Sequence, residues 1–277
     1  MFHRRMDGAP TASISHGGAE TARLLLAGDG LGFSVSVVTA PVSGPHRLFY
    51  KHHWEASYML EGRALLEDED TGDRWELGPG DMYIVGPGDM YIVGPNDRHL
   101  VTDLTPCRAL GVFNPPVIGH ENHDDEGTYP PGGPVPPGKP KMWVATPDSL
   151  RAAGHEKTSV TGTATLLRYL LAQDGLGFTW SDVTIHGGTQ NRLWYKNHWE
   201  ANYVIAGSGT VTHETTGERI LLAPGALYCV GPDDPHVLAT EDGLHIASLF
   251  NPPLDGTEMH DADGGYPPTA PLPPGPG

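Results

Sequence analysis

The same motifs occur twice in this chain of 277 residues, and this internal repeat constrains its fold more than any other feature. Because a domain typically has about 100–150 residues, the repeat predicts two similar domains. The repeated motifs, in chain order, are DGLGF at 29–33 and 174–178, HWEA at 53–56 and 198–201, and FNPP at 113–116 and 250–253.

The first copy carries an extra segment of eight residues. GDMYIVGP at 80–87 is followed at once by the same eight residues at 88–95, whereas the second copy has GALYCVGP once, at 225–232. A Pro- and Gly-rich stretch at 129–141 then separates the copies, and a similar stretch ends the sequence. We expect both stretches to be an extended linker and tail, neither helix nor strand. The predicted domains are therefore 1–138 and 139–277.

The charge and composition argue against several classes of function. Acidic residues number 34 and basic residues 17, and the resulting net charge of −17 disfavours nucleic acid and anionic membrane surfaces as partners. No apolar run approaches the ~18 residues of a membrane-spanning helix. Two cysteines are too few for a disulfide framework, so we expect a reducing, cytoplasmic location.

Most of each half is predicted to form short strands. Segments 193–207, 210–223 and 226–232 are rich in aromatic and β-branched residues and are bounded by Gly, Pro or Asp. Segment 161–175 and its counterpart 21–30 fit either a short helix or a strand. With 37 Gly and 27 Pro to form turns, the sequence predicts an all-β fold with a jelly roll or small barrel in each half.

A candidate metal site is clearest in the second half. Glu200 is followed by Gly207 seven residues later, and a Pro-Gly pair further on is followed by Tyr228. This outline resembles the two cupin motifs, which usually carry His-x-His before the Glu and a His after the Pro-Gly. Here Tyr228 takes the last place, and His236 follows after a GPDDP turn. We expect a hairpin that places Tyr228 and His236 on adjacent strands facing one interior.

The first half offers two tyrosines for the equivalent place. Glu55 to Tyr83 preserves the 28-residue gap of the second half, whereas Tyr91 to His99 preserves its eight-residue gap. A carboxylate, a phenol oxygen and an imidazole suit iron(II) or manganese, and they also suit zinc. The alternative is a set of buried polar residues that holds no metal.

Two further histidines, His53 and His198, lie two residues before each glutamate and so on the same strand face. We expect them to be either substitute ligands or groups that support the ligands.

These residues lie within longer segments that resemble the ectoine synthase family. The segments are RYLLAQDGLGF at 168–178, YKNHWEA at 195–201, PGALY at 224–228 and FNPPLDGTEMHDADG at 250–264. Members of this family are single cupins that form dimers and use iron(II) to close N-acetylated 2,4-diaminobutyrate into a cyclic amidine with loss of water. The resemblance implies two tandem cupin domains, as a monomer that mimics such a dimer or as a homodimer.

The resemblance also implies the site residues. The metal ligands fall on Glu200, Tyr228 and His236, and on Glu55, Tyr91 (or Tyr83) and His99. The catalytic and substrate-facing positions fall on Arg23, Tyr50, His53, Phe113, Glu121 and His123 in the first half, and on Arg168, Tyr195, His198, Phe250, Glu258 and His260 in the second.

The chain departs from the family at two places in each half. Ala19 and Ala164 stand where the family usually has Trp, and Val38 and Val183 stand where it has the first of two Thr. We therefore expect an iron-dependent cyclising lyase that acts on a small N-acylated diamino acid or a similar polar substrate. The alternatives are an iron(II) cupin oxygenase and a sensor that binds a ligand without turnover.

Overall fold

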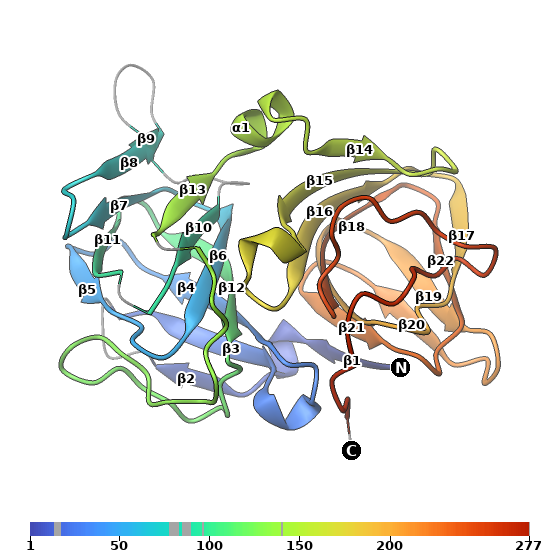
Figure 1. Cartoon of the computed structure of the whole chain (residues 1–277), viewed down its shortest axis with the longest axis horizontal. Coiled ribbons are helices and arrows are strands. Elements are labelled where there is room, and N and C mark those ends of the chain that lie inside the picture. Colours follow the sequence, from blue (N-terminus) through green and yellow to red (C-terminus); the bar gives the residue numbers. More distant parts are fainter. Residues whose placement is uncertain (14–17, 78–82, 85–89, 96, 140, 277) are drawn as a thin grey trace. The chain divides into compact units, whose positions relative to one another are not determined.

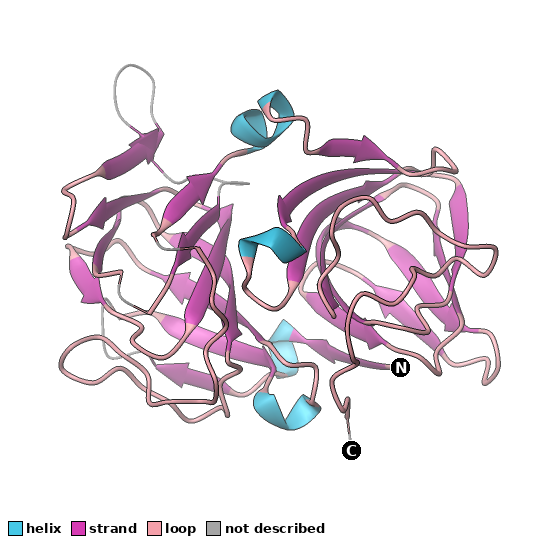
Figure 2. Cartoon of the chain, in the orientation of Figure 1, coloured by secondary structure: helices cyan, strands magenta, loops and turns pink. Residues whose placement is uncertain are grey.

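The structure is a computed structural model that describes the whole chain except residues 14–17, 78–82, 85–89, 96, 140 and 277. The described residues are almost entirely strands and loops, which confirms the all-β prediction (Figure 1) (Figure 2). They divide into two compact units. The N-terminal unit is Ala9–Pro147, and the C-terminal unit combines Met1–Gly8 with Asp148–Gly277.

The N-terminal unit consists of a larger and a smaller antiparallel sheet. The larger sheet, in spatial order, is β13 (Trp143–Ala145), β10 (Met90–Val93), β6 (Trp54–Glu61), β12 (Cys107–Asn114), β4 (Ser34–Ala40), β3 (Glu20–Leu25) and β2 (Thr11–Ser13). The smaller sheet is β5 (His46–Leu48), β11 (His99–Asp103), β7 (Ala64–Asp68), β8 (Arg74–Leu77) and β9 (Tyr83–Ile84).

The C-terminal unit repeats this plan. Its larger sheet is β1 (Phe2–Arg5), β21 (Ala226–Val230), β18 (Trp199–Gly207), β23 (Leu244–Asn251), β16 (Thr179–Ile185), β15 (Ala164–Leu170) and β14 (Glu156–Thr158). Its smaller sheet is β17 (Thr189–Leu193), β22 (His236–Thr240), β19 (Gly209–His213) and β20 (Arg219–Leu222).

The helical elements are short. They are η1 (Met6–Gly8), η2 (Ala27–Asp29), α1 (Pro147–Ala152) and η3 (Ala172–Asp174). No helix within the described part of the chain has the length and apolarity needed to cross a membrane.

The segments that fit either helix or strand contain the strands β3 and β15. Each strand pairs along its length with the next one, β4 or β16, and its side chains are mostly buried. A single 3-10 turn then ends in a glycine with a left-handed backbone, Gly30 or Gly175. The helix-like apolar run arises because both faces of these strands are covered, which removes the polar and apolar alternation of a half-exposed strand.

Each compact unit contains one strand from the opposite half of the sequence. β1 pairs with β21, so that Phe2 lies opposite Cys229, and β13 pairs with β10, so that Ala145 lies opposite Met90. The units therefore differ from the predicted division at residue 138 in two segments, 1–8 and 139–147. Without these strands, β21 and β10 would present unpaired backbone groups at a sheet edge.

The Pro-rich stretches form neither helix nor strand, but they pack on their own units instead of acting as free linkers. Trp54 Nε1 donates to the carbonyl of Pro136 at 2.9 Å, and Trp199 Nε1 donates to that of Pro273 at 3.3 Å. Glycine is required beside each indole, since a Cβ at Gly275 would lie 2.1 Å from the Trp199 ring. The expectation of segments without helix or strand holds, whereas their packing on the indoles, whose N–H groups donate to proline carbonyls, was not expected from the sequence.

Deleting residues 1–8 removes β1 and leaves β21 at the sheet edge. We expect amide exchange in β21 to become faster by about 10-fold or more, because its backbone loses a pairing strand. Hydrogen-exchange mass spectrometry measures this directly, and β10 in the N-terminal unit is the internal control that keeps its protection. Unchanged protection of β21 would contradict the pairing.

Candidate metal and substrate site

The C-terminal unit encloses a cavity of about 530 Å³ that is lined by residues from both sheets. The large sheet supplies strands β14, β15, β16, β18, β21 and β23, and the small sheet supplies β17 and β22. The predicted site residues that line this cavity are Arg168, Tyr195, Glu200, Tyr228, Phe250, Glu258 and His260.

Glu200 lies near the start of β18 with its carboxylate buried in the barrel. Its Oε1 accepts a hydrogen bond of 2.9 Å from Ser248 Oγ on β23, whereas Oε2 is buried and has no partner among the described residues. Burial raises the pKa of Glu200 to about 7, although the Asn202 amide and the Ser248 hydroxyl oppose the shift. A carboxylate in this position needs a positive partner to stay charged.

Tyr228 lies beside Glu200 on the neighbouring strand. β21 pairs with β18 so that Tyr228 is opposite Asn202, two residues beyond Glu200 on the same face. Burial first, and then the charge of Glu200, raise the pKa of Tyr228 well above its usual value. The phenol therefore stays protonated unless a cation replaces its proton.

His236 comes from the opposite sheet, so the predicted hairpin with Tyr228 was wrong. β22 pairs with β17 and β19, not with β21. The GPDDP segment crosses between the sheets because Gly231 packs on an indole and its N–H donates to Asp234 Oδ2 at 2.8 Å. Nevertheless the ring of His236 is fully buried and lies 6.4 Å from the ring of Tyr195, which lines the cavity, although His236 itself does not line it.

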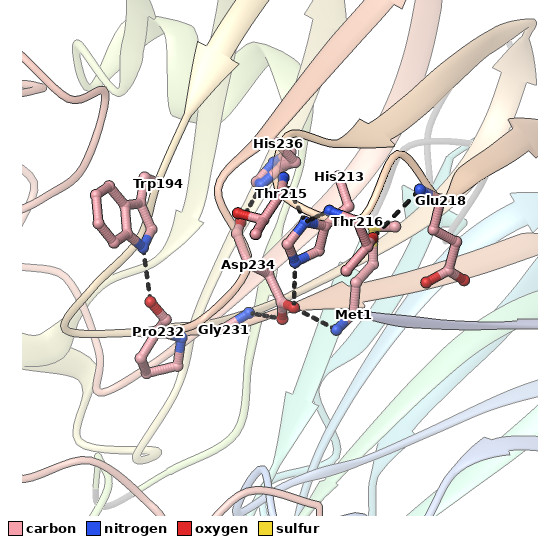
Figure 3. Close-up of polar contacts among 10 residues, drawn as sticks. All are labelled: Met1, Trp194, His213, Thr215, Thr216, Glu218, Gly231, Pro232, Asp234 and His236. Carbon is pink, nitrogen blue, oxygen red and sulfur yellow. Dashed lines mark hydrogen bonds and ion pairs between the residues drawn. The ribbon is translucent and has the colours of Figure 1, made fainter.

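A buried polar network holds the loop that carries His236 (Figure 3). His236 Nδ1 lies 2.9 Å from the carbonyl of Asp234 and must donate to it, which leaves the lone pair on Nε2. The Asp234 carboxylate pairs with the amino group of Met1, and its Oδ1 lies 3.4 Å from His213 Nε2. The network fixes both the tautomer and the direction of the imidazole.

The donor atoms of this set fit a metal ion. Glu200 Oε2 and His236 Nε2 are both buried without hydrogen-bond partners among the described residues, and so are Glu55 Oε2 and His99 Nε2 in the other unit. Buried polar atoms are rarely left unpaired, so the same unpaired atoms in both copies indicate a bound group. No three His, Cys, Asp or Glu side chains converge anywhere in the described parts of the chain, so a three-ligand site requires the tyrosine oxygen.

Arg168 lies at a bulge in β15, where the pairing register with β16 shifts. Its Nη1 is buried without a hydrogen-bond partner among the described residues and lies 4.0 Å from Glu258 Oε2. Glu258 is occupied by the backbone N–H groups of Asp255 and Gly256. Arg168 therefore offers the cavity a cationic donor that the protein itself does not satisfy.

A cluster of aromatic rings forms one wall of the cavity. Tyr195 Oη lies 3.1 Å from His260 Nε2, and the His260 ring stacks on Tyr266 at 4.4 Å between centroids. Phe250 meets Tyr195 edge-on at 4.9 Å. Burial lowers the pKa of His260 and raises that of Tyr195, so the pair is a neutral imidazole and a protonated phenol at neutral pH.

Tyr266 and its counterpart Tyr129 are site residues that the sequence reasoning missed. Both line their cavities although both belong to the Pro-rich stretches that were predicted to be linker and tail. The signal was the repeated Tyr-Pro-Pro, which occurs after the acidic block in both halves.

The predicted site histidines His53 and His198 do not line the cavities. Both ring nitrogens of His53 contact carbonyls, Pro115 at 2.8 Å and Pro130 at 3.0 Å, which leaves no nitrogen for a metal. His198 Nε2 lies 3.4 Å from Thr269 Oγ1 in the other Pro-rich stretch. Of the two expectations for these histidines, the geometry favours the supporting group over the substitute ligand.

The N-terminal unit repeats the arrangement around a smaller cavity of about 90 Å³. Of the predicted residues, Arg23, Tyr50, Glu55, Tyr91, Phe113 and His123 line it. His99 is fully buried with its ring 6.1 Å from that of Tyr91, and burial lowers its pKa to about 4. Burial also raises the pKa of Glu55 to about 8.

The strand register separates the two candidate tyrosines. Tyr91 lies opposite Ser57, two residues beyond Glu55, as Tyr228 lies opposite Asn202. Tyr83 is on β9, which pairs with β8 in the smaller sheet, and its side chain lies outside the described residues. The extra octapeptide copy therefore precedes the site strand β10, mostly in the segment that the structure does not describe.

The arginine of the N-terminal unit differs from its counterpart. Arg23 Nη1 donates to Glu121 Oε2 at 2.7 Å, and Nη2 donates to the Glu121 carbonyl at 2.6 Å. Burial alone would raise the pKa of Glu121, but backbone N–H groups and Arg23 outweigh it and lower that pKa. Arg23 thus makes hydrogen bonds of 2.6–2.7 Å with Glu121, whereas Arg168 Nη1 has only the 4.0 Å ion pair with Glu258.

Comparison with known proteins agrees with this geometry. The family described as ectoine synthase matches residues 7–132 and 142–270. L-ectoine synthase of Desulfatibacillum aliphaticivorans is 41% identical over 126 residues, which are 46% of this chain and 97% of that protein.

Two solved structures share the fold over most of this chain. Oxalate decarboxylase of Lactobacillus farciminis, in a formate complex, has a TM-score of 0.64 at 14% sequence identity. The match covers 91% of this chain and 86% of the decarboxylase chain. A cupin 2 conserved barrel domain protein from Leptotrichia buccalis has a TM-score of 0.54 at 9% sequence identity. That match covers 90% of this chain and 95% of the Leptotrichia chain.

The jelly-roll fold and the duplicated interior site define a protein of two cupin domains. The family match covers nearly all of both copies. The chain belongs to the ectoine synthase family and carries two copies of its domain.

The register leads us to predict that Tyr91, not Tyr83, donates to a metal in the N-terminal unit. The Glu200→Gln substitution is made first, to remove metal binding at the C-terminal site. In that variant, Tyr91→Phe should weaken Mn(II) binding by more than about 10-fold because an oxygen donor is lost. Tyr83→Phe should leave the affinity unchanged. Electron paramagnetic resonance of free Mn(II) measures both affinities, and the reverse order would contradict the assignment.

Proposed function

We propose that the chain is a metal-dependent cyclising hydro-lyase whose C-terminal unit binds a small N-acylated diamino acid or a similar polar substrate. Membership of the ectoine synthase family supports an enzyme of the lyase class. The observation that carries the proposal is Arg168, whose buried Nη1 has no hydrogen-bond partner in the described chain and borders the larger cavity. A carboxylate substrate would supply the missing partner.

Glu200, Tyr228 and His236 would hold the metal, with Fe(II) as the proposed ion and manganese or zinc as substitutes. When bound, such an ion supplies Lewis acidity toward a carbonyl oxygen of the substrate. In the N-terminal unit the same role falls to Glu55, Tyr91 and His99.

The residues around this set would bind and orient the substrate. Arg168 would bind its carboxylate, while Glu258, fixed by backbone N–H groups, forms a 4.0 Å ion pair with the guanidinium. Phe250 and Tyr266 form an apolar wall that excludes water from the reacting end. Orientation of this kind brings an amine and an amide carbonyl of one molecule into contact.

Ring closure forms a carbon–nitrogen bond between the amine and the amide carbon, and the amide oxygen leaves as water. The attacking amine must lose protons and the departing oxygen must gain them. The Tyr195–His260 pair is placed for this work, because a neutral imidazole accepts a proton and a protonated phenol donates one. His198 is not proposed for this role because it does not line the cavity.

The pocket departs from its relatives at two residues that line the cavity, Ala164 and Val183. A smaller residue in place of an aromatic one leaves more room, which supports a substrate that differs in its acyl group or chain length. Family membership does not favour the oxygenase alternative, and no observation in the described residues favours a sensor without turnover.

The proposed reaction needs no oxygen. Anaerobic incubation of the Fe(II)-loaded protein with N-acetyl-2,4-diaminobutyrate, and with homologues that differ in acyl group or chain length, should give at least one product lighter by one water in mass spectrometry. A product that forms only with oxygen, with oxygen consumed, would contradict the lyase and indicate an oxygenase.

Replacing Arg168 by Met should lower kcat/KM by about 10- to 100-fold, mainly through KM, because a charged hydrogen bond to the substrate carboxylate is lost. Arg219→Met is the matched control, since Arg219 is exposed on β20 and does not line the cavity. A loss in kcat alone, with KM unchanged, would argue against substrate binding by Arg168.

A further inference from the structure

The duplication gives each candidate metal site a counterpart in the same chain, and the two sites differ at residues that touch the ligands. Ser248 on β23 lies opposite Asn202, which is two residues beyond Glu200. Gly111 on β12 lies opposite Ser57, which is two residues beyond Glu55. Ser248 and Gly111 are therefore equivalent positions in the two barrels.

Only one of these residues can orient its glutamate. Ser248 Oγ donates to Glu200 Oε1 at 2.9 Å, which fixes the carboxylate with its other oxygen free toward the interior. Gly111 has no side chain to do the same for Glu55. A ligand already held in its binding direction loses less freedom when the metal binds.

The residues that support the candidate histidine ligands also differ between the two barrels, and again the C-terminal ligand is held more firmly. His213 lies opposite His236, and Asp68 takes the same place opposite His99. His213 Nε2 lies 3.4 Å from Asp234 Oδ1, and the Asp234 carbonyl holds His236 Nδ1 at 2.9 Å (Figure 3). The corresponding contact of His99 Nδ1 is longer, 3.2 Å.

Asp68 cannot support the N-terminal loop in this way. The loop residue that corresponds to Asp234 is Asp97, and Asp68 faces it as a like charge instead of a donor. The carboxylate of Asp68 instead accepts from the backbone N–H groups of Asp70 and Thr71, at 2.8 and 3.2 Å.

We propose that the two metal sites are inequivalent: the C-terminal site binds a divalent metal at least about 10-fold more tightly than the N-terminal site, with Ser248 as a positioning residue for Glu200. This inference rests on the metal sites of the proposed function. It makes the C-terminal unit, which also has the larger cavity and an arginine whose Nη1 lacks a hydrogen bond among the described residues, the site that is loaded first.

The test is a titration of the metal-free, full-length chain with Mn(II), followed by electron paramagnetic resonance of the free ion. The expected result is two classes of site whose affinities differ by about 10-fold or more. Glu200→Gln should abolish the tight class, and Glu55→Gln should abolish the weak class.

The chain supplies matched variants for the role of Ser248. Ser248→Ala should weaken the tight class by about 10-fold, and Ser248→Thr, which keeps the hydroxyl, should restore it. Gly111→Ser should tighten the weak class, since a Cβ at Gly111 meets nothing closer than Glu55 Oε1 at 3.8 Å and so fits without strain. Thermal unfolding of the metal-free variants, expected to be unchanged, separates positioning from a general loss of stability.

The inference is supported if the C-terminal site is the tighter class, Ser248→Ala weakens it, and Gly111→Ser tightens the weak class. Two equal classes, or a tight class abolished by Glu55→Gln, overturn the inference and leave the proposed function standing. Binding that neither glutamate variant reduces overturns the metal sites of the proposed function, and the inference with them.

Discussion

Polar ligand atoms that are buried without partners are the constraint on which the candidate site depends. Glu200 and Tyr228 come from the larger sheet of the C-terminal barrel, and His236 comes from the smaller one. Leaving one buried polar atom unpaired typically costs about 1–3 kcal/mol, and both barrels leave the same atoms unpaired. This destabilising cost arises where side chains from opposite sheets meet, and a bound cation would offset it by pairing with all three side chains at once.

The two copies keep this set and diverge around it. In the N-terminal unit Arg23 and Glu121 form a buried ion pair, which satisfies both charges within the protein. In the C-terminal unit the equivalent arginine is held loosely at 4.0 Å and borders a larger cavity. The arginine of one copy is therefore held by short hydrogen bonds within the protein, whereas in the other copy Nη1 of the equivalent arginine lacks a hydrogen bond among the described residues.

Much of the fold could be predicted because the repeat, the turn residues and the β-branched runs all indicate the same architecture. The candidate ligands could be proposed from the sequence because spacing places Glu200 and Tyr228 on strands that recur in both halves. Spacing alone could not distinguish Tyr83 from Tyr91, since the octapeptide copies are identical and only the pairing of β10 with β6 separates them.

Three features depended on contacts between distant segments, and sequence patterns carry little information about these. The GPDDP turn has the composition of a hairpin, but packing on Trp199 makes it cross between sheets. Tyr129 and Tyr266 belong to stretches whose composition suggests a linker, yet both side chains line the cavities. The placement of β1 beside β21 joins residues more than two hundred positions apart.

The most direct test of the central claim is anomalous diffraction at the iron absorption edge from crystals of the Fe(II)-loaded chain. The account predicts a peak in the C-terminal barrel within bonding distance of Glu200 Oε2, Tyr228 Oη and His236 Nε2. A peak bound by other side chains, or a fully loaded crystal with no peak among these three atoms, would contradict it.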